Sequence, residues 1–283
     1  MKKYNWLERI LFLPTFINKE KLKRELRGKT ILITGASSGI GKELSYFLAD
    51  LEVHLILVAR REEILGTMKD EIERKTARVS VYRADLREQN EVEGLLSFIQ
   101  NSPNGLDIIV SNAGKSIKRS IYDSLDRYHD FQRTMSVNYF APVQLLLSLI
   151  PNLEKNGGQI IQISTINTML LPFPYWAAYQ ASKSAFDTWF QAAAPELNAR
   201  GISTTSIYLP LVRTPMILPT KEYRTMPAMN PEHVAQIVSK SMYTKKKKYR
   251  PWWLIFGQVT SVLFRGLYER WMPKMISKRG KVK

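Results

Sequence analysis

The sequence contains no cysteine and only three histidines among its 283 residues. Without thiols the chain can form neither disulfide bonds nor thiolate metal sites, and nothing points to an oxidising compartment. His54, His129 and His233 are scattered, without the spacing that metal ligands show, so we expect no metal site.

Long apolar runs are also missing. No segment reaches the roughly 18 uninterrupted apolar residues of a membrane span. At the N-terminus, basic residues precede a broken apolar run, without the apolar core and small-residue cleavage site of a secretory signal. The sequence therefore predicts a cytoplasmic protein.

Acidic residues are scarce, and the resulting net charge of +17 is concentrated at the two ends of the chain. Residues 1–30 hold nine Lys or Arg and three Glu, and residues 240–283 hold thirteen Lys or Arg and one Glu. Such ends suit anionic lipid or a phosphorylated ligand, or they are solvated tails. No recognised nucleic-acid module accompanies the KKKK run at 245–248, so we expect no nucleic-acid partner.

From residue 30 onward, short apolar runs alternate with longer amphipathic stretches. Alternating strands and helices indicate βαβ units, and hence an α/β fold with a parallel sheet covered by helices on both faces. We predict one domain over 29–244, between a basic N-terminal extension, 1–28, and a basic aromatic C-terminal extension, 245–283. The predicted strands are rich in Ile and Val and span 30–34, 53–59, 79–84, 106–111, 158–164 and 202–209.

The first predicted strand runs directly into a glycine-rich turn, "TILITGASSGIGKEL", which opens a helix. Gly35, Gly39 and Gly41 permit a tight turn and let the backbone approach a pyrophosphate closely. The N–H groups at the start of the helix would then face the anion. This strand–turn–helix context predicts a dinucleotide site.

The second predicted strand ends in "LVARREE", with Arg60 and Arg61 and no acid at its tip. An acid at this position favours a free ribose 2′-hydroxyl, whereas arginine favours a 2′-phosphate. We therefore predict NADP(H) as the cofactor. The alternative is that Arg60 only forms ion pairs with Glu62, Glu63 or Asp85.

The stretch "YQASK" places Tyr179 and Lys183 four residues apart, on the same face of a predicted helix. An ammonium group beside a phenol stabilises the phenolate, so we expect Lys183 to lower the pKa of Tyr179. The pair is then a candidate acid and base for a carbonyl oxygen. Ser164, at the end of the fifth predicted strand, could hydrogen-bond the same carbonyl.

These features together resemble the short-chain dehydrogenase/reductase family, over about residues 28–240. The resemblance implies a Rossmann-type, doubly wound parallel sheet of order 3-2-1-4-5-6, with a seventh strand. The motifs that carry it occur in the family's order: "TGASSGIG" (34–41), "ADL" (84–86), "SNAG" (111–114), "SVNYF" (136–140), "QIST" (162–165) and "YQASK" (179–183).

By that resemblance, four residues form a catalytic tetrad: Asn138, Ser164, Tyr179 and Lys183. Tyr179 would protonate the carbonyl oxygen while the nicotinamide delivers hydride, and Ser164 would orient the substrate. Lys183 would bind the ribose and tune Tyr179, and Asn138 would hold a water that links Lys183 to solvent.

The resemblance also implies a set of cofactor contacts. Asp85 and Leu86 would touch the adenine, and Val212 and Thr214 the carboxamide of nicotinamide. The sequence departs from the family where Pro210 is followed by Leu211 instead of glycine. The full set is Gly35, Ser37, Ser38, Gly39, Ile40, Gly41, Arg60, Arg61, Asp85, Leu86, Asn112, Ala113, Gly114, Tyr179, Lys183, Pro210, Val212 and Thr214.

The segment 212–238, "VRTPMILPTKEYRTMPAMNPEHVAQIV", is similar to the corresponding segment of bacterial long-chain fatty acyl-CoA reductases. We expect a flexible apolar ligand here, because the segment contains three methionines, Met216, Met226 and Met229. The predicted substrate is a lipophilic carbonyl, such as a long-chain acyl-CoA or fatty aldehyde. The alternatives are a steroid-like or other bulky ketone or alcohol, and a membrane-associated NADP-binding scaffold with little turnover.

The C-terminal stretch 251–272 is predicted to be one basic, aromatic, amphipathic helix. This helix suits peripheral contact with an anionic membrane, a lid, a subunit contact or intramolecular packing. At the N-terminus, an apolar stretch over 6–12 is either a second anchor or packs beneath the sheet. We expect a homo-oligomer, either a dimer or a tetramer. The residues on the predicted C-terminal face are Trp252, Phe256, Val259, Leu263, Leu267 and Trp271.

Overall fold

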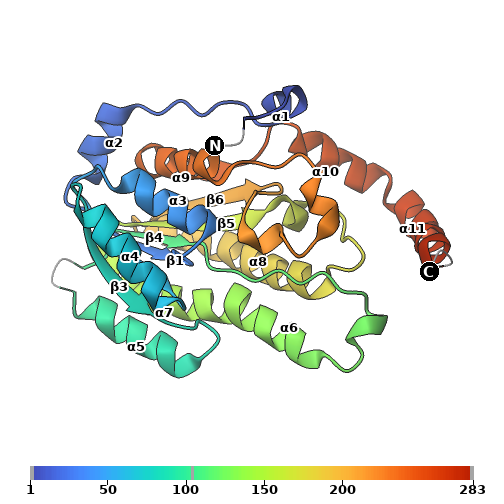
Figure 1. Cartoon of the computed structure of the whole chain (residues 1–283), viewed down its shortest axis with the longest axis horizontal. Helices are drawn as coiled ribbons and strands as arrows, with labels where there is room; N and C mark the ends of the chain where they lie inside the picture. The colour runs from blue at the N-terminus through green and yellow to red at the C-terminus, as the bar shows by residue number, and fades with distance from the viewer. Residues whose placement is uncertain (1–2, 103–104, 281–283) are drawn as a thin grey trace.

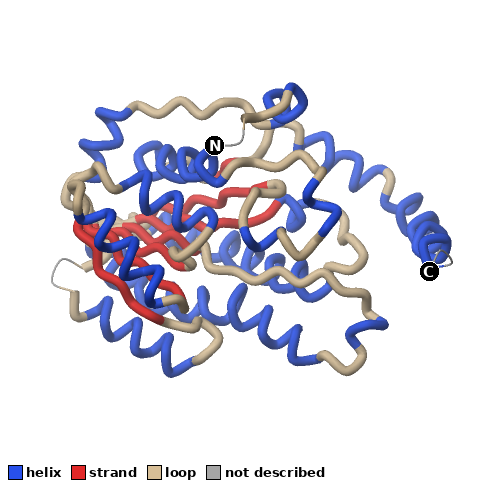
Figure 2. Tube along the Cα trace, viewed as in Figure 1, coloured by secondary structure: helices blue, strands red, loops and turns tan. Residues whose placement is uncertain are grey.

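The computed structural model describes residues 3–102 and 105–280 and contains one seven-stranded parallel sheet at its centre (Figure 2). The strand order is β3-β2-β1-β4-β5-β6-β7 (Figure 1), which confirms the predicted Rossmann-type order and the seventh strand. The strands are β1 (Thr30–Thr34), β2 (His54–Ala59), β3 (Arg78–Arg83), β4 (Ile108–Ser111), β5 (Gln159–Thr165), β6 (Ser203–Leu209) and β7 (Lys248–Tyr249). Because β7 pairs with β6, the sheet extends into the range assigned to the C-terminal extension.

Helices cover both faces of the sheet, so each central strand is buried on both sides. In β1, Ile31 and Ile33 face a core shared with α2, α3, α4 and α9, whereas Leu32 faces a core shared with α5, α7 and α8. The helices are α1 (Trp6–Leu11), α2 (Lys19–Leu26), α3 (Gly39–Leu48), α4 (Glu62–Glu73), α5 (Gln89–Gln100), α6 (Tyr128–Met135), α7 (Ala141–Lys155), α8 (Ala177–Ala199), α9 (Pro231–Thr244), α10 (Leu254–Leu263) and α11 (Arg265–Gly280).

The N-terminal segment is fastened to α9 through the buried His233. Its ring nitrogens hydrogen-bond the Tyr4 hydroxyl and the Thr15 hydroxyl, each at 3.1 Å. Phe12 is buried in the core, whereas Trp6 and Ile10 are exposed. Packing is therefore confirmed for Phe12, whereas the second anchor stays a prediction for the exposed side.

A buried carboxylate links α1 to the loop that follows β6. Glu8, only 3 % exposed, accepts hydrogen bonds from the guanidinium of Arg213 and from the backbone N–H of Ala228, the latter at 3.2 Å. Arg213 also donates to Asn230 Oδ1 at 2.8 Å. Although burial alone would raise it, these contacts hold the pKa of Glu8 below its ordinary value.

The two ends of the chain meet beside α1. The indole N–H of Trp252 donates to the carbonyl of Ile10 at 3.0 Å, and that of Trp253 to the carbonyl of Leu11 at 3.2 Å. Figure 1 shows α1 and α10 side by side. The start of the C-terminal extension is therefore bound to the N-terminal extension, while α11 projects from the body of the molecule (Figure 1).

The single C-terminal helix predicted from the sequence is wrong, because the chain breaks at Phe264 between α10 and α11. The break divides the predicted apolar face between two helices. All six side chains of that face are exposed, which contradicts intramolecular packing for them. Within the described residues, no helix is long and apolar enough to span a membrane.

Replacing Glu8 with Gln should lower the free energy of unfolding by about 3 kcal/mol, because the largely buried Arg213 loses its counter-charge. Urea unfolding at neutral pH measures this loss. A lowered pKa stabilises the fold above the ordinary glutamate value of 4.5, so the difference between wild type and variant should shrink as the pH falls below 4.5. Glu25→Gln, at an exposed pair with Arg24, is the control and should cost under about 0.5 kcal/mol.

Candidate active site

The four predicted catalytic residues gather at the carboxyl edge of the sheet. Ser164 lies at the end of β5, and Tyr179 and Lys183 lie in the first two turns of α8. Asn138 lies in a single π-helical turn, Ser136–Phe140, between α6 and α7. In an open α/β sheet this edge is where ligands bind.

Lys183 and Asn138 converge on Gly114. A Cβ placed on Gly114 would lie 3.2 Å from Asn138 Oδ1 and 3.6 Å from Lys183 Nζ. The ammonium group of Lys183 donates to the carbonyl of Ile163 at 3.1 Å. This hydrogen bond directs the ammonium group of Lys183 toward the end of β5, at the residue before Ser164.

Asn138 holds the chain after β4 against α8. Its Oδ1 accepts from the N–H of Lys115 at 2.9 Å, and its Nδ2 donates to the Lys115 carbonyl at 2.9 Å and to the Ser182 hydroxyl at 2.9 Å. The side chain is buried, with all these partners in place. The water that Asn138 would hold remains a prediction.

The glycine turn has the close approach that a phosphate site requires. Gly35 and Gly39 have positive φ angles of 67° and 55°. A Cβ on Gly41 would lie 2.5 Å from the Gly35 carbonyl, so only glycine fits. At the start of α3, the N-cap Ser38 makes no side-chain capping bond, which leaves the N–H groups around Ile40 available to an anion.

Thr34 joins the glycine turn to the segment after β4. Its hydroxyl accepts from the N–H groups of Asn112 and Ala113, each at 3.0 Å, and the Asn112 amide donates to the Thr34 carbonyl at 2.9 Å. Sequence reasoning placed Thr34 in a motif but gave it no role. The nearby Leu86 is buried beside Ala113.

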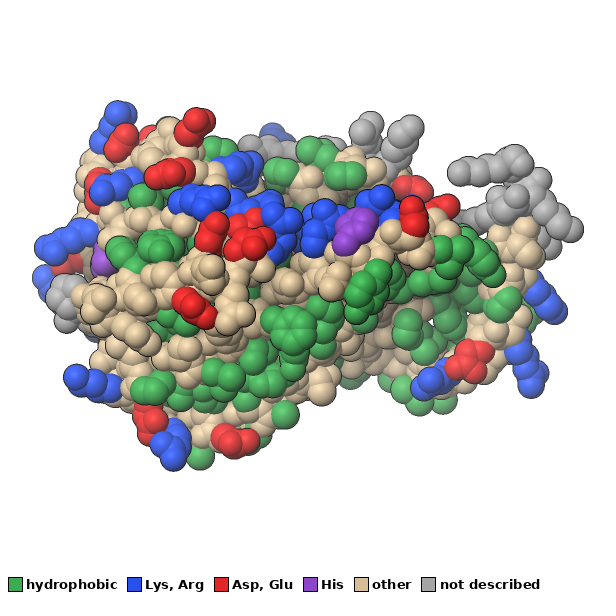
Figure 3. Space-filling view, turned by 90° about the horizontal axis from the view of Figure 1, so that it is seen from below, with side chains coloured by type: hydrophobic (Ala, Val, Ile, Leu, Met, Phe, Trp, Pro, Cys, Tyr) green, Lys and Arg blue, Asp and Glu red, His purple; other side chains and the backbone are tan. Residues whose placement is uncertain are grey.

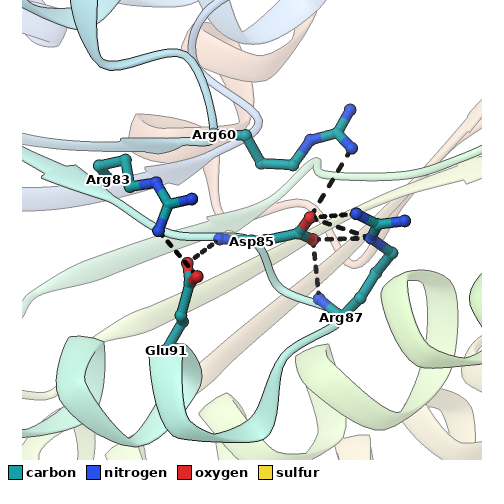
Figure 4. Close-up of polar contacts among 5 residues, drawn as sticks. All are labelled: Arg60, Arg83, Asp85, Arg87 and Glu91. Carbon is teal, nitrogen blue, oxygen red and sulfur yellow. Dashed lines mark hydrogen bonds and ion pairs between the residues drawn. The ribbon is translucent and has the colours of Figure 1, made fainter.

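The two arginines predicted to read the 2′-phosphate occupy different positions. Arg61 donates to the Ser37 hydroxyl and carbonyl at 3.0 Å, which places its guanidinium against the glycine turn. Arg60 is 63 % exposed and lies 3.8 Å from Asp85 (Figure 4). Asp85 is held mainly by Arg87, whose hydrogen bonds keep the pKa of this carboxyl low despite its burial. Arg60 therefore forms a long ion pair with Asp85, one of the three acidic partners named in the alternative interpretation. Its contact with a 2′-phosphate stays a prediction.

The loop after β6 brings Thr214 to the glycine turn. A Cβ on Gly39 would lie 2.8 Å from the Thr214 methyl group. In the loop, which begins at Pro210, the N–H of Met229 donates to the Leu211 carbonyl at 2.8 Å, and the N–H of Arg213 donates to the Met229 carbonyl at 2.9 Å. Val212, between them, is buried. Met229 is thus a core residue and does not belong to the apolar loop over the site.

The predicted lowering of the Tyr179 pKa by Lys183 is wrong for this structure. Burial raises the pKa of Tyr179 to about 12, opposed only by a hydrogen bond with the Thr165 side chain. Burial also lowers the pKa of Lys183 to about 8, although the charge of Asp187 works against this shift. The physical reason is that the lysine is desolvated and bonded to the Ile163 carbonyl.

The family model of the short chain dehydrogenases matches residues 29–224. The chain belongs to the short-chain dehydrogenase family. A fatty acyl-CoA reductase of Acinetobacter baylyi is 42 % identical over 231 residues, which cover 81 % of this chain and 78 % of that protein. A fatty acyl-CoA reductase of Mycobacterium tuberculosis is 35 % identical over 228 residues, 80 % of this chain and 78 % of the relative. A hydroxysteroid 11-beta-dehydrogenase 1-like protein of Gallus gallus is 30 % identical over 238 residues, 81 % of each chain.

A solved structure shares the fold of this short-chain dehydrogenase. The short-chain dehydrogenase of Sphingobium yanoikuyae, in complex with NADPH, has a TM-score of 0.72 and 22 % identity, over 78 % of this chain and 86 % of that one. This chain is therefore an oxidoreductase of the family. The catalytic roles of Asn138, Ser164, Tyr179 and Lys183 stay predictions.

Asp187 is a buried residue of the site that sequence reasoning missed. Its carboxylate, 3 % exposed, accepts hydrogen bonds from Ser164 Oγ at 3.2 Å, Gln162 Nε2 at 3.2 Å and Gln191 Nε2 at 2.8 Å. It lies one helical turn after Lys183, and its charge raises the pKa of that lysine. The available signal was a lone acid in the apolar run "SAFDTWF". Asp187 therefore positions the serine and supports the charge of the lysine.

Aromatic side chains pack against one side of Tyr179, which is partly exposed. Trp176 meets Tyr179 edge-on, with ring centroids 6.0 Å apart, and stacks on Tyr223 of the loop after β6 at 5.6 Å. Lys118 donates to Glu222 of the same loop at 2.6 Å. The loop over 215–227 therefore lies close to Tyr179 through Trp176.

Asp187→Asn should shift the alkaline limb of the pH–rate profile to lower pH. Without the carboxylate the pKa of Lys183 falls further below its ordinary value, so the charged lysine is lost earlier as the pH rises. The measurement is kcat and KM from pH 6 to pH 9, and kcat should fall more than KM. Gln191→Leu is the control, because it removes one hydrogen bond and keeps the charge. A lower melting temperature with an unmoved profile would show that Asp187 is only structural.

Proposed function

We propose that this short-chain dehydrogenase uses NADPH to reduce the carbonyl group of a long-chain acyl-CoA or a fatty aldehyde. The observation that carries the proposal is the position of the tetrad under a loop with exposed apolar side chains, Met216, Leu218 and Met226. The C-terminal helices border the same site, since Tyr268 donates to the carbonyl of Pro172 and Ser261 accepts from the N–H of Leu171 at 3.4 Å. The names of the two acyl-CoA reductase relatives support this substrate class.

The choice of NADPH is supported by the two arginines after β2. Arg61 lies against the glycine turn, and Arg60 directs an exposed guanidinium to the same edge. No acidic side chain occupies the tip of β2 itself, where it would repel a 2′-phosphate. The glycine turn and the uncapped start of α3 fit the pyrophosphate.

NADPH, when bound, would supply the hydride to the carbonyl carbon. Tyr179 remains protonated at neutral pH, because burial raises its pKa to about 12, and its hydroxyl then donates a proton to the carbonyl oxygen. Lys183, whose pKa burial lowers to about 8, still carries its charge at neutral pH and would bind the ribose of the cofactor, as the family resemblance implies. Asp187 holds Ser164 at the substrate side.

With a thioester the tetrahedral adduct would expel the coenzyme A thiolate and leave an aldehyde. A second molecule of NADPH would have to supply the hydride that converts that aldehyde into an alcohol, with a second proton from Tyr179. The apolar loop and the nearby α10 and α11 would shield the acyl chain from water, and removal of this apolar surface from water favours binding.

A bulky or steroid-like ketone is the second candidate substrate. The relative from Gallus gallus supports it, because it is named after hydroxysteroid dehydrogenases and matches the whole catalytic region. Trp176 and Tyr223 would provide a flat aromatic surface for a ring system.

The wild type should oxidise NADPH, in strong preference to NADH, in the presence of palmitoyl-CoA or hexadecanal. With palmitoyl-CoA it should release free thiol, because the thiolate is the leaving group. Tyr179→Phe should lower kcat by at least about a hundredfold, since it removes the proton donor and retains the ring. NADPH absorbance and a thiol reagent measure the two products.

The control is NADPH affinity, which Tyr179→Phe should leave within a few-fold of wild type. Turnover of cyclic ketones alone would contradict the acyl-CoA proposal and favour the second candidate. NADPH binding without turnover of any carbonyl would favour a scaffold.

We also propose that the protein is a homo-oligomer. Figure 3 views the side on which α5 and α6 lie in Figure 1 and shows a band of hydrophobic side chains across it. Phe140 and Leu147, seven residues apart, are exposed on one side of the α7 helix. A second copy of the chain would cover them. Sedimentation velocity should therefore show a dimer or larger species, and a monomer at micromolar concentration would contradict this proposal.

A further inference from the structure

A cavity lies away from the tetrad, beside the contact between the N-terminal and C-terminal extensions. It has a volume of about 390 Å³ and lies between the segment 11–15, the end of α9 and the segment 246–252. Thr205, in the first half of β6, lines it, whereas Ser164 pairs with Tyr208 further along the sheet. No residue of the tetrad lines this cavity.

No acidic residue balances the positive charge at this cavity. Four cationic residues line it, Lys240, Lys246, Lys248 and Arg250, and no acidic residue does. Across residues 3–102 and 105–280, none of the four takes part in an ion pair. Arg250 donates to the neutral amide of Gln258 at 3.4 Å, whereas the Lys248 ammonium donates to Gln191 of α8 at 3.3 Å, on the face of the sheet opposite α9. Lys240 of α9 and Arg250 are therefore the cations assigned to the cavity, and they favour an anionic ligand.

An exposed apolar surface adjoins the cavity. Leu13 and Trp252 line the cavity and are also 57 % and 50 % exposed. Trp252 meets Phe256 of α10 edge-on at 6.2 Å and donates to the carbonyl of Ile10 in α1. Because Trp6, Ile10, Ile255 and Phe256 are exposed as well, the apolar surface continues from the cavity over α1 and α10.

The combination of cations and apolar surface restricts what can occupy the cavity. A small soluble anion would neutralise the charge but leave the apolar side chains in water. A second copy of this chain would place the same cations opposite one another. A phospholipid in a bilayer supplies both an anionic headgroup and an apolar phase for exposed Trp, Leu, Ile and Phe side chains.

We propose that this cavity binds the headgroup of an anionic phospholipid in a membrane surface, while the exposed side chains of α1 and α10 enter the interface. Lys240 and Arg250 would then contact the headgroup. Lys245 and Lys247 are exposed and do not line the cavity, so they serve as a matched control.

The test compares Lys240→Gln/Arg250→Gln with the matched pair Lys245→Gln/Lys247→Gln, which changes the net charge equally. The measurement is co-sedimentation with phosphatidylcholine vesicles and with vesicles that also contain phosphatidylglycerol. Wild type should prefer the anionic vesicles. Loss of the two cavity cations should weaken that binding about tenfold or more, and loss of the other two by less than about threefold.

Equal weakening by the two pairs would overturn the proposal, because it would show attraction by charge alone. The absence of any preference for anionic vesicles would also overturn it. Competition by millimolar glycerol 3-phosphate that abolishes vesicle binding would identify a site for a soluble anion instead. Reductase turnover in solution and the melting temperature are the controls for folding. Neither should change, since the substituted residues lie outside the catalytic site.

Discussion

A side chain on Gly41 would lie 2.5 Å from the carbonyl oxygen of Gly35, and this lack of space determines the geometry of the site. Because α3 begins so close to the end of β1, its N–H groups face the carboxyl edge of the sheet. The same turn is joined to the chain after β4 through Thr34 and Asn112. The segment after β4 in turn carries Gly114, on which Asn138 and Lys183 converge.

The two extensions are parts of the folded domain, because their contacts reach the catalytic region. Glu8 binds Arg213, the residue before Thr214, and Thr214 lies against the glycine turn. Trp252 and Trp253 bind the backbone beside α1. A change at either end of the chain can therefore reach the loop over the active site through a short series of direct contacts.

The sheet and the placement of Tyr179 beside Lys183 could be predicted from the sequence because local backbone requirements determine them, whereas the tetrad as a set was implied by the family resemblance. The glycine turn needs residues without Cβ atoms, and each strand is a short run of branched apolar residues between turn formers. Tyr179 and Lys183 are placed by helical periodicity alone. Such signals lie within a few neighbouring residues.

The remaining features depend on contacts between distant parts of the chain. The pair of Glu8 and Arg213 spans 205 positions and leaves no local pattern. The raised pKa of Tyr179 depends on burial, opposed by a hydrogen bond with the Thr165 side chain, and neither can be read from the "YQASK" stretch. The break at Phe264 divides a segment whose periodicity resembles one helix. Asp187 left a signal, a lone acid in an apolar helix, but its partners come from β5 and β6.

The contact between Glu8 and Arg213 also bears on the order of folding. The two residues are 205 positions apart, and strands β1 to β6 lie between them in the chain. A contact at this sequence separation forms only after a long loop has been closed, so we expect α1 to dock late, onto a sheet that is already largely assembled.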